Sequence, residues 1–224
     1  MIPKHKVVVF DLDDTLYKEI DYVKSGFKHI ASLVSNVNAP EEEVYRLLLD
    51  TCRQGDNAFE TVVRKYGFLF FNVQWMIAAY RNHKPRIALD DDTKKTLDGL
   101  KANGTVMGII TDGRRMQQLN KVEALGLEQY IDEENIVINE VEERHKPDRH
   151  SFHTFMAKYG SDCDYWFVGD NTGKDFLAPN YLGWMTVCLL DDGRNIHKQN
   201  FDMPEMFLPK RRISKFKELE GGHR

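Results

Sequence analysis

The chain has 224 residues, 42% of them hydrophobic, which suits one elaborated domain or a core with a small insertion. A formal net charge of -4 gives no broad basic field and argues against nucleic-acid or membrane partners. Three widely spaced cysteines form neither a disulfide framework nor a Cys-x-x-Cys metal site, and no apolar run approaches the roughly 18 residues that span a bilayer. The apolar stretch near the N-terminus is too short for a signal peptide, so we expect a cytoplasmic protein, either a monomer or a homodimer.

Five apolar segments predict strands that alternate with helices along the chain. Most are rich in Val and Ile and lack strict alternation, as expected for parallel strands that are covered on both faces. Helices are predicted at 90–102, 114–125, 148–159 and 172–182. This order is typical of an α/β fold with a Rossmann-like, doubly wound parallel sheet. The predicted strands are KVVVF (6–10), TVMGII (105–110), NIVI (135–138), DYWFVG (164–169) and MTVCLL (185–190).

Residues 18–88 interrupt this alternation, because they contain no convincing strand. We read them as an inserted α-helical domain, which leaves residues 1–17 and 89–224 as the α/β core. The basic segment PKRRISKFKELE (209–220) is expected to be a solvated terminal helix. Within the insertion, amphipathic patterns predict helices at 21–37, 40–52, 57–67 and 73–83.

Polar side chains follow four of the predicted strands. The carboxyl ends of parallel strands meet at one edge of the sheet, and ligands bind there. The polar residues that we expect at this edge are Asp11, Asp13, Asp14 and Thr15 after the first strand, Thr111, Asp112 and Gly113 after the second, Lys146 some way after the third, and Asp170 and Asp175 after the fourth.

The chemistry of this set suits a phosphate ester and a hard divalent cation. Clustered carboxylates repel one another unless a cation or a shared proton compensates. Mg²⁺ prefers oxygen ligands and typically uses a few carboxylates together with water and phosphate. Asp11 can attack phosphorus once the charges are screened, while Lys146 and the N–H groups around Gly113 stabilise charge in the transition state.

In order, and over nearly the whole chain, these segments resemble the four motifs of the haloacid dehalogenase superfamily of phosphohydrolases. FDLDDTL matches the first motif, D-x-D-x-T, and TDG matches the second. Lys146 in HKPD matches the third motif, and GDNTGKD matches the paired acids of the fourth. The resemblance implies a Rossmann-like core, an α-helical cap at residues 18–88, and Mg²⁺-dependent chemistry through an aspartyl-phosphate intermediate.

The resemblance also implies a role for each matching residue. Asp11 would be the nucleophile, and Asp13 would be the general acid for the leaving group and then the base for water. Thr111 and Lys146 would hold the phosphoryl group, in a phosphate site completed by Asp112 and Gly113.

The metal site implied by the resemblance uses the first and fourth motifs. Asp170 would bind Mg²⁺ together with Asp11 and the backbone carbonyl of Asp13, and Asp175 would support this site. True dehalogenases of the superfamily lack the second acid of the first motif, so Asp13 favours phosphoryl transfer over carbon–halogen cleavage.

These features predict a phosphomonoesterase that acts on a small soluble phosphorylated metabolite, such as a sugar phosphate or a nucleotide. A phosphosugar mutase with the same site is the alternative among enzymes, and a catalytically idle binding protein is the alternative from another class. Arg114 and Arg115 after TDG either reach the substrate or form a solvated first turn of a helix. Lys18 and Arg53 are possible substrate contacts, for which an exposed structural role is the favoured interpretation.

Two other patterns are assigned to structure. Cys188 begins a C-x5-R spacing like that of cysteine phosphatases, but it lies inside a predicted strand, so we expect a core residue. His145, His150 and His153 lack an evident acidic or thiol partner and are expected at the surface.

Overall fold

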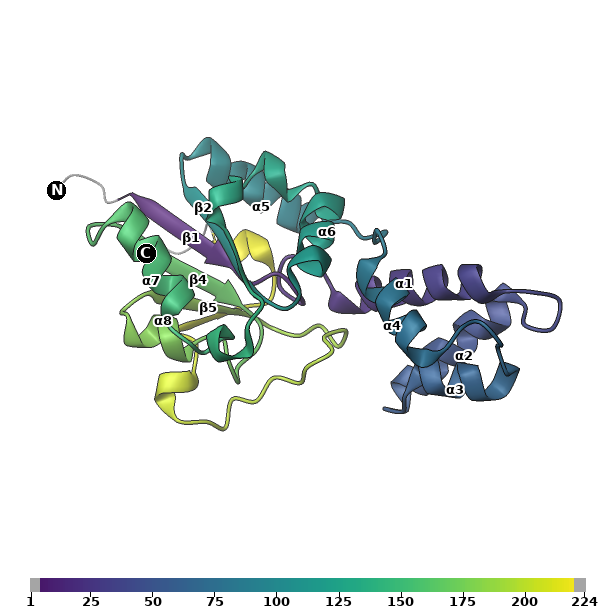
Figure 1. Ribbon diagram of the computed structural model, residues 1–224. Coiled ribbons are helices and arrows are strands. Elements are labelled where there is room, and N and C mark those ends of the chain that lie inside the picture. The colour runs from purple at the N-terminus through teal and green to yellow at the C-terminus, as the bar shows by residue number, and fades with distance from the viewer. Residues whose placement is uncertain (1–4, 220–224) are drawn as a thin grey trace. The chain divides into compact units, whose positions relative to one another are not determined.

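The computed structural model describes residues 5–219, and these residues contain one sheet of six parallel strands (Figure 1). Residues 1–4 and 220–224 lie outside the described range, including the start of the segment considered for a signal peptide and the end of the basic segment. The order of the strands is β3-β2-β1-β4-β5-β6. Their bounds are β1 Lys6–Phe10, β2 Val106–Asp112, β3 Ile136–Asn139, β4 Asp164–Gly169, β5 Met185–Leu189 and β6 Arg211–Ile213.

Strand β1 runs through the centre of the sheet because its side chains are apolar on both faces. Val7 and Val9 are fully buried, and so is Phe10. Val9 pairs with Gly108 of β2 on one side and with Phe167 of β4 on the other. All five predicted strands are confirmed, and the sheet is the predicted doubly wound type.

Four helices cover the two faces of the sheet. α5 (Asp91–Ala102) and α6 (Arg115–Leu125) lie on one face, while α7 (His150–Tyr159) and α8 (Leu177–Tyr181) lie on the other (Figure 1). α8 is shorter than predicted, because residues 171–176 form a turn instead of helix. Short 3₁₀ helices occupy Leu127–Gln129, Glu133–Asn135, Glu142–Arg144, Glu205–Phe207 and Phe216–Leu219.

The prediction of a solvated helix in the basic segment is wrong. Residues Arg211–Ile213 form the edge strand β6 against β5, and a 3₁₀ helix follows at Phe216–Leu219. Ile213 and Phe216 are buried, and the ring of Phe216 lies 6.0 Å from that of Phe10. The segment's apolar side chains are spaced for helix, but pairing with β5 satisfies the backbone of the sheet edge and still buries them.

The chain divides into two compact units, one comprising Met1–Ile20 with Ala88–Arg224 and the other Asp21–Ile87. The second unit is helical, and the four helices predicted in this region are confirmed. Asn57 and Asn72 cap the third and fourth helices by accepting the N–H groups of Glu60 and Trp75. The helix bounds are α1 Glu19–Val34, α2 Glu41–Arg53, α3 Ala58–Tyr66 and α4 Val73–Asn82.

Within residues 5–219, no helix is both long enough and apolar enough to cross a bilayer.

Candidate active site

The residues predicted to carry the chemistry lie together at the carboxyl edge of the sheet. A cavity of about 110 Å³ is located at this edge. Lys146 and Asp175 do not line it but contact or adjoin the acids that do. The cavity is lined by six residues predicted at this edge, Asp11, Asp13, Asp14, Thr111, Asp112 and Asp170, and by Glu19, Asn171, Lys174 and His197.

Lys146 is a fully buried cation between two carboxylates. Its Nζ contacts Asp11 Oδ1 and lies 2.8 Å from Asp175 Oδ1. Burial by itself would lower the pKa of Lys146, but the carboxylates of Asp11 and Asp175 raise it well above its ordinary value. The side chain therefore stays charged without contact with solvent, beside the proposed nucleophile.

Three buried acids converge next to this lysine. Single carboxylate oxygens of Asp11, Asp170 and Asp175 all lie within 4.8 Å of one another. The hydroxyl of Thr15 is 3.4 Å from both Asp11 Oδ2 and Asp170 Oδ1. Burial raises the pKa of Asp170 to about 9, and the neighbouring carboxylates add to this effect. Burial likewise raises the pKa of Asp11 to about 6, against the opposing charge of Lys146.

This donor set fits a hard divalent cation. It consists of oxygen atoms, and burial together with the neighbouring carboxylates raises the pKa values of Asp11 and Asp170, a cost to their ionised forms that a cation would offset. Asp175 Oδ2 accepts the backbone N–H groups of Asp170 and Asn171, which fixes the start of the fourth motif. A Cβ on Gly169 would come within 2.5 Å of Asp175, so this close approach requires glycine.

Asp13 occupies a different environment from Asp11, two residues earlier. Lys121 Nζ donates to both of its oxygens, at 2.7 and 2.9 Å. Gln118 Nε2 donates to Oδ2 at 3.0 Å, and the hydroxyl of Tyr17 donates to Oδ1. Burial by itself would raise the pKa of Asp13, but the Lys121 ammonium and these hydrogen bonds hold it below its ordinary value.

Thr111 and Asp112 are the last residues of β2 and line the cavity, and Gly113 follows them. Thr111 is buried, and its Oγ1 accepts a hydrogen bond of 2.6 Å from Gln118 Nε2. Asp112 Oδ1 accepts from Asn139 Nδ2 at 2.9 Å and from the backbone N–H of Lys146 at 3.1 Å, so this carboxylate ties the third motif to β2.

Asp112 and Gly113, which we expect to complete the phosphate site, also make contacts within the protein. The Gly113 N–H donates to the carbonyl of Asn139 at 2.9 Å, which continues the β2–β3 pairing by one residue. Asp112 Oδ2 pairs with Lys174 Nζ at 3.3 Å. Lys174 lines the cavity, and the sequence analysis did not select it.

The loop between β5 and β6 completes the site, and the sequence analysis missed it. Asn195 Nδ2 donates to Asp170 Oδ2 at 2.9 Å, and Lys18 Nζ donates to Asn195 Oδ1 at 2.7 Å. Gln199 Nε2 donates to the backbone carbonyl of Asp170 at 2.8 Å. Lys18 therefore holds this loop beside the fourth motif, and it is not among the residues that line the cavity.

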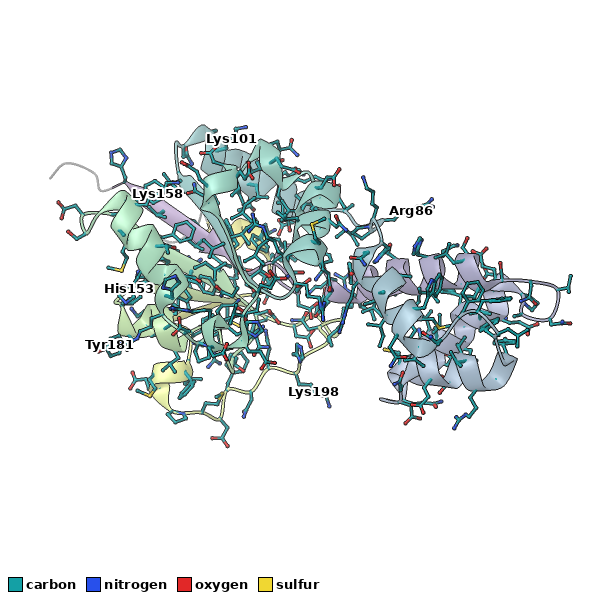
Figure 2. All side chains as sticks on the ribbon, viewed as in Figure 1. Arg86, Lys101, His153, Lys158, Tyr181 and Lys198 are labelled. Atoms are coloured by element: carbon teal, nitrogen blue, oxygen red, sulfur yellow. The ribbon has the colours of Figure 1, made fainter. Side chains whose placement is uncertain are left out.

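The same loop adds His197 to the wall of the cavity. The N–H of the neighbouring Ile196 donates to Asp14 Oδ2 at 2.8 Å. Asp14 has a φ of 56°, in the left-handed region, where an aspartate is tolerated when its carboxylate is bonded locally. Figure 2 marks the loop at Lys198, whose side chain points away from the core. A polar segment after a fifth parallel strand was the signal available in the sequence.

The remaining side chains considered in the sequence lie elsewhere. Arg114 and Arg115 are exposed and do not line the described cavity. Arg53 is exposed and pairs with Asp50 of its own helix. Cys188 is a buried core residue, as predicted, and burial raises the pKa of its thiol to about 12. Figure 2 shows His153 on α7, where it is exposed.

Comparison with known proteins agrees with this geometry. The family model described as haloacid dehalogenase-like hydrolase matches residues 8–188. The glyceraldehyde 3-phosphate phosphatase of Methanocaldococcus jannaschii is 28% identical over 197 residues, covering 83% of this chain and 85% of that protein.

Two solved structures share the fold over almost the whole chain. The HAD hydrolase YfnB of Bacillus subtilis has a TM-score of 0.64 at 17% identity, with 98% of each chain covered. The HAD phosphatase of Thermococcus onnurineus has a TM-score of 0.58 at 19% identity, with 96% of each chain covered. With a family match over most of its length, this chain is an enzyme that belongs to the haloacid dehalogenase-like hydrolases.

Proposed function

We propose that the chain is a Mg²⁺-dependent phosphomonoesterase that hydrolyses a small phosphate ester through an aspartyl-phosphate intermediate. One observation carries the proposal, namely the meeting of the buried Lys146 with Asp11 beside the oxygens of Asp170 and Asp175. A nucleophilic carboxylate needs nearby positive charge to approach a phosphate dianion. Lys146 supplies one such charge, and the acid cluster suits a divalent cation.

The residues that would hold the metal are Asp11, Asp170 and, by family resemblance, the backbone carbonyl of Asp13. Bound there, Mg²⁺ supplies positive charge that screens the phosphate from the carboxylates. Asp175 keeps the fourth motif in place through the N–H groups of Asp170 and Asn171. Asp170 Oδ1 then lies 3.4 Å from the Thr15 hydroxyl, and Asn195 Nδ2 donates to Asp170 Oδ2.

In the first half-reaction a carboxylate oxygen of Asp11 attacks phosphorus, and the bond from phosphorus to the ester oxygen breaks. Asp13 gives a proton to the departing oxygen, Thr111 at the wall of the cavity holds the phosphoryl group, and Lys146 adds positive charge through its contact with Asp11. A phosphate dianion beside Asp13 disfavours its ionised form, so substrate binding raises the pKa of this carboxyl and favours uptake of the proton. In the second half-reaction Asp13 takes a proton from the water that attacks the aspartyl-phosphate, and phosphate leaves.

The substrate class that we propose is a small phosphorylated metabolite in the cytoplasm. The curated relatives are named glyceraldehyde 3-phosphate phosphatases, so triose phosphates head the candidates. The cavity of about 110 Å³ offers room for a phosphate group with a short tail. We assign to residues 21–87 the role of a cap that selects among such substrates, in keeping with their helical insertion after the first motif.

The test is a phosphate-release screen over triose, sugar and nucleoside monophosphates, with Mg²⁺ or with EDTA. The proposal expects Mg²⁺-dependent turnover of at least one ester and trapping of phosphate on Asp11 in acid-quenched protein. Full activity of the wild type in EDTA would refute the metal dependence. Turnover by Asp11→Asn above a few per cent of the wild type would refute the intermediate.

A further inference from the structure

Helix α6 buries polar side chains where a helix that only packs on a sheet buries apolar ones. Its buried residues are Gln118, Lys121, Val122 and Leu125. Lys121 is 2% exposed and Gln118 is 1% exposed. Removing an ammonium group from water is costly unless a partner compensates, and apolar residues of similar volume would cover the sheet without that cost. The two polar residues therefore call for an explanation other than packing.

The hydrogen bonds of Gln118 and Lys121 provide this explanation, because both side chains donate to residues of the proposed catalytic site. Positions 118 and 121 are three residues apart and thus share a face of the helix. Lys121 Nζ donates to Asp13 Oδ1 and Oδ2 at 2.7 and 2.9 Å. Gln118 Nε2 donates to Asp13 Oδ2 at 3.0 Å and to Thr111 Oγ1 at 2.6 Å.

We propose that Lys121 and Gln118 are positioning residues that hold the acid–base carboxylate of Asp13 in the orientation needed for proton transfer. This inference rests on the proposed function. Proton transfer to a leaving group requires the carboxyl oxygen within hydrogen-bond reach of the ester oxygen. Asp13 shares its cavity with the carboxylates of Asp11, Asp14 and Glu19, which repel it, and the Lys121 ammonium counters that repulsion.

Gln118 extends the effect to the phosphate site. Because its amide donates to Thr111 Oγ1, the hydroxyl hydrogen of Thr111 is left to donate elsewhere, and the cavity is where a phosphoryl oxygen would accept it. One amide thus orients both the acid–base group and a phosphoryl ligand.

The experiment compares Lys121→Met and Gln118→Met with the wild type on two substrates, the best alkyl phosphate and p-nitrophenyl phosphate. The quantity to compare is kcat/KM, which covers the steps up to loss of the leaving group and excludes attack by water. Alkyl leaving groups need a proton, whereas p-nitrophenolate leaves without one. We expect Lys121→Met to lower kcat/KM about 10²-fold for the alkyl ester and less than about fivefold for the aryl ester.

Gln118→Met should likewise lower kcat/KM more for the alkyl ester than for the aryl ester. It should also raise the inhibition constant of inorganic phosphate as a competitive inhibitor, because Thr111 loses its orientation. Lys121→Met should leave the inhibition constant of phosphate within about threefold of the wild type. Lys121→Arg keeps a charged donor and should restore part of the alkyl-ester activity.

The matched control is Lys158→Met. Lys158 lies on α7 (Figure 2) and pairs with Glu134 at 2.7 Å, so the substitution breaks an ion pair outside the site and should leave kcat/KM on both substrates unchanged. Circular dichroism and thermal unfolding establish that each variant is folded. Should Lys121→Met fail to fold, Lys121→Arg and Gln118→Met decide the matter by the same substrate comparison.

Equal losses on the two esters in folded variants, or a loss of stability with unchanged kcat/KM, would overturn the positioning role. In either case turnover by the wild type would still stand in support of the proposed function. A wild type that releases no phosphate from any ester would overturn both proposals together.

Discussion

Two carboxylates of the first motif, Asp11 and Asp13, are two residues apart and lie in opposite electrostatic surroundings. Asp11 adjoins two further buried acids and shares a single buried lysine with Asp175. Asp13 accepts hydrogen bonds from Lys121, Gln118 and Tyr17. Burial raises the pKa of Asp11 to about 6, whereas Lys121 holds the pKa of Asp13 below its ordinary value.

The difference separates the roles of two residues of one type. Strand β1 presents Asp11 to the acids of the fourth motif, while the turn after it carries Asp13 toward α6. Pairs of titratable groups whose surroundings push their pKa values apart mark the division of labour in an active site. Asp11 belongs to the acid cluster that suits a divalent cation. Lys121 favours the ionised form of Asp13, so the proposed acid role requires a bound phosphate to raise the pKa of this carboxyl.

The largest effect is expected from Asp11→Asn, which removes the proposed nucleophile from the acid cluster. Turnover should fall below about one per cent of the wild type, since the neutral amide does not form the phosphoryl-enzyme. Thermal stability without metal should be kept or increased, because one of the repelling charges is gone. Phosphate release and calorimetry on the same preparation measure both quantities. A variant that loses stability together with activity would contradict the account of the cluster.

Asp13→Ala tests the other member of the comparison. We expect kcat/KM to fall about 10²- to 10⁴-fold for alkyl phosphates, and much less for p-nitrophenyl phosphate, because only the alkyl leaving group needs an acid. Asp11→Asn, in contrast, should lower kcat/KM equally for the two substrates. Steady-state kinetics on the two esters decide the point, and a uniform loss for Asp13→Ala would remove the acid role.

The pH dependence of stability should also separate the two carboxylates. Asp11 and Asp170 have raised folded-state pKa values, so they bind protons more tightly in the folded protein than in the unfolded chain. Their contribution to the free energy of unfolding is therefore present near pH 4. The contribution of Asp11 is lost as the pH rises through about 6, and that of Asp170 is lost as the pH rises through about 9. Asp13 has a lowered pKa, so its contribution is present above its ordinary value of 3.8 and is lost as the pH falls through its folded-state pKa.

Mg²⁺ should cancel the alkaline loss, since the metal replaces the protons that the acids otherwise share. We expect Mg²⁺ at 100 times its dissociation constant to stabilise the protein at pH 8 by about 2.7 kcal/mol. At pH 5 the same concentration should have a much smaller effect. Urea unfolding with Mg²⁺ or EDTA at the two pH values provides the measurement, and Asp170→Asn is the control that should abolish the difference. Equal stabilisation at both pH values would argue against these acids as the ligands.

The smallest effect is expected from Asn195→Ala in the loop after β5. Asn195 donates to Asp170 Oδ2, and loss of a hydrogen bond to a metal ligand typically weakens metal affinity about 10- to 100-fold. Excess Mg²⁺ should restore most of the activity, in contrast to Asp11→Asn. A titration of activity against Mg²⁺ measures the shift, and an unchanged midpoint would show that the loop does not act on the metal site.

Several features of the molecule could be predicted because they depend on nearby residues alone. The five strands appear as short apolar runs, since burial on both faces demands apolar side chains at every position. The acids at the ends of β1 and β4 could be placed at one edge because parallel strands end together. The sequence by itself therefore determined the fold class, the helical insertion and the set of candidate residues Asp11, Asp13, Thr111, Lys146, Asp170 and Asp175.

The tertiary structure decided which partners these residues have. Lys121 reads as an ordinary helical lysine, and its burial against Asp13 appears only when α6 packs on the sheet. Asn195 lies 25 residues after Asp170, so no local pattern joins them. Arg211–Ile213 became a strand rather than a helix because β5 offered an unpaired edge. The periodicity of apolar residues indicates which side chains are buried. Which groups bury them depends on contacts between distant segments of the chain, and these contacts set the pKa of each carboxylate.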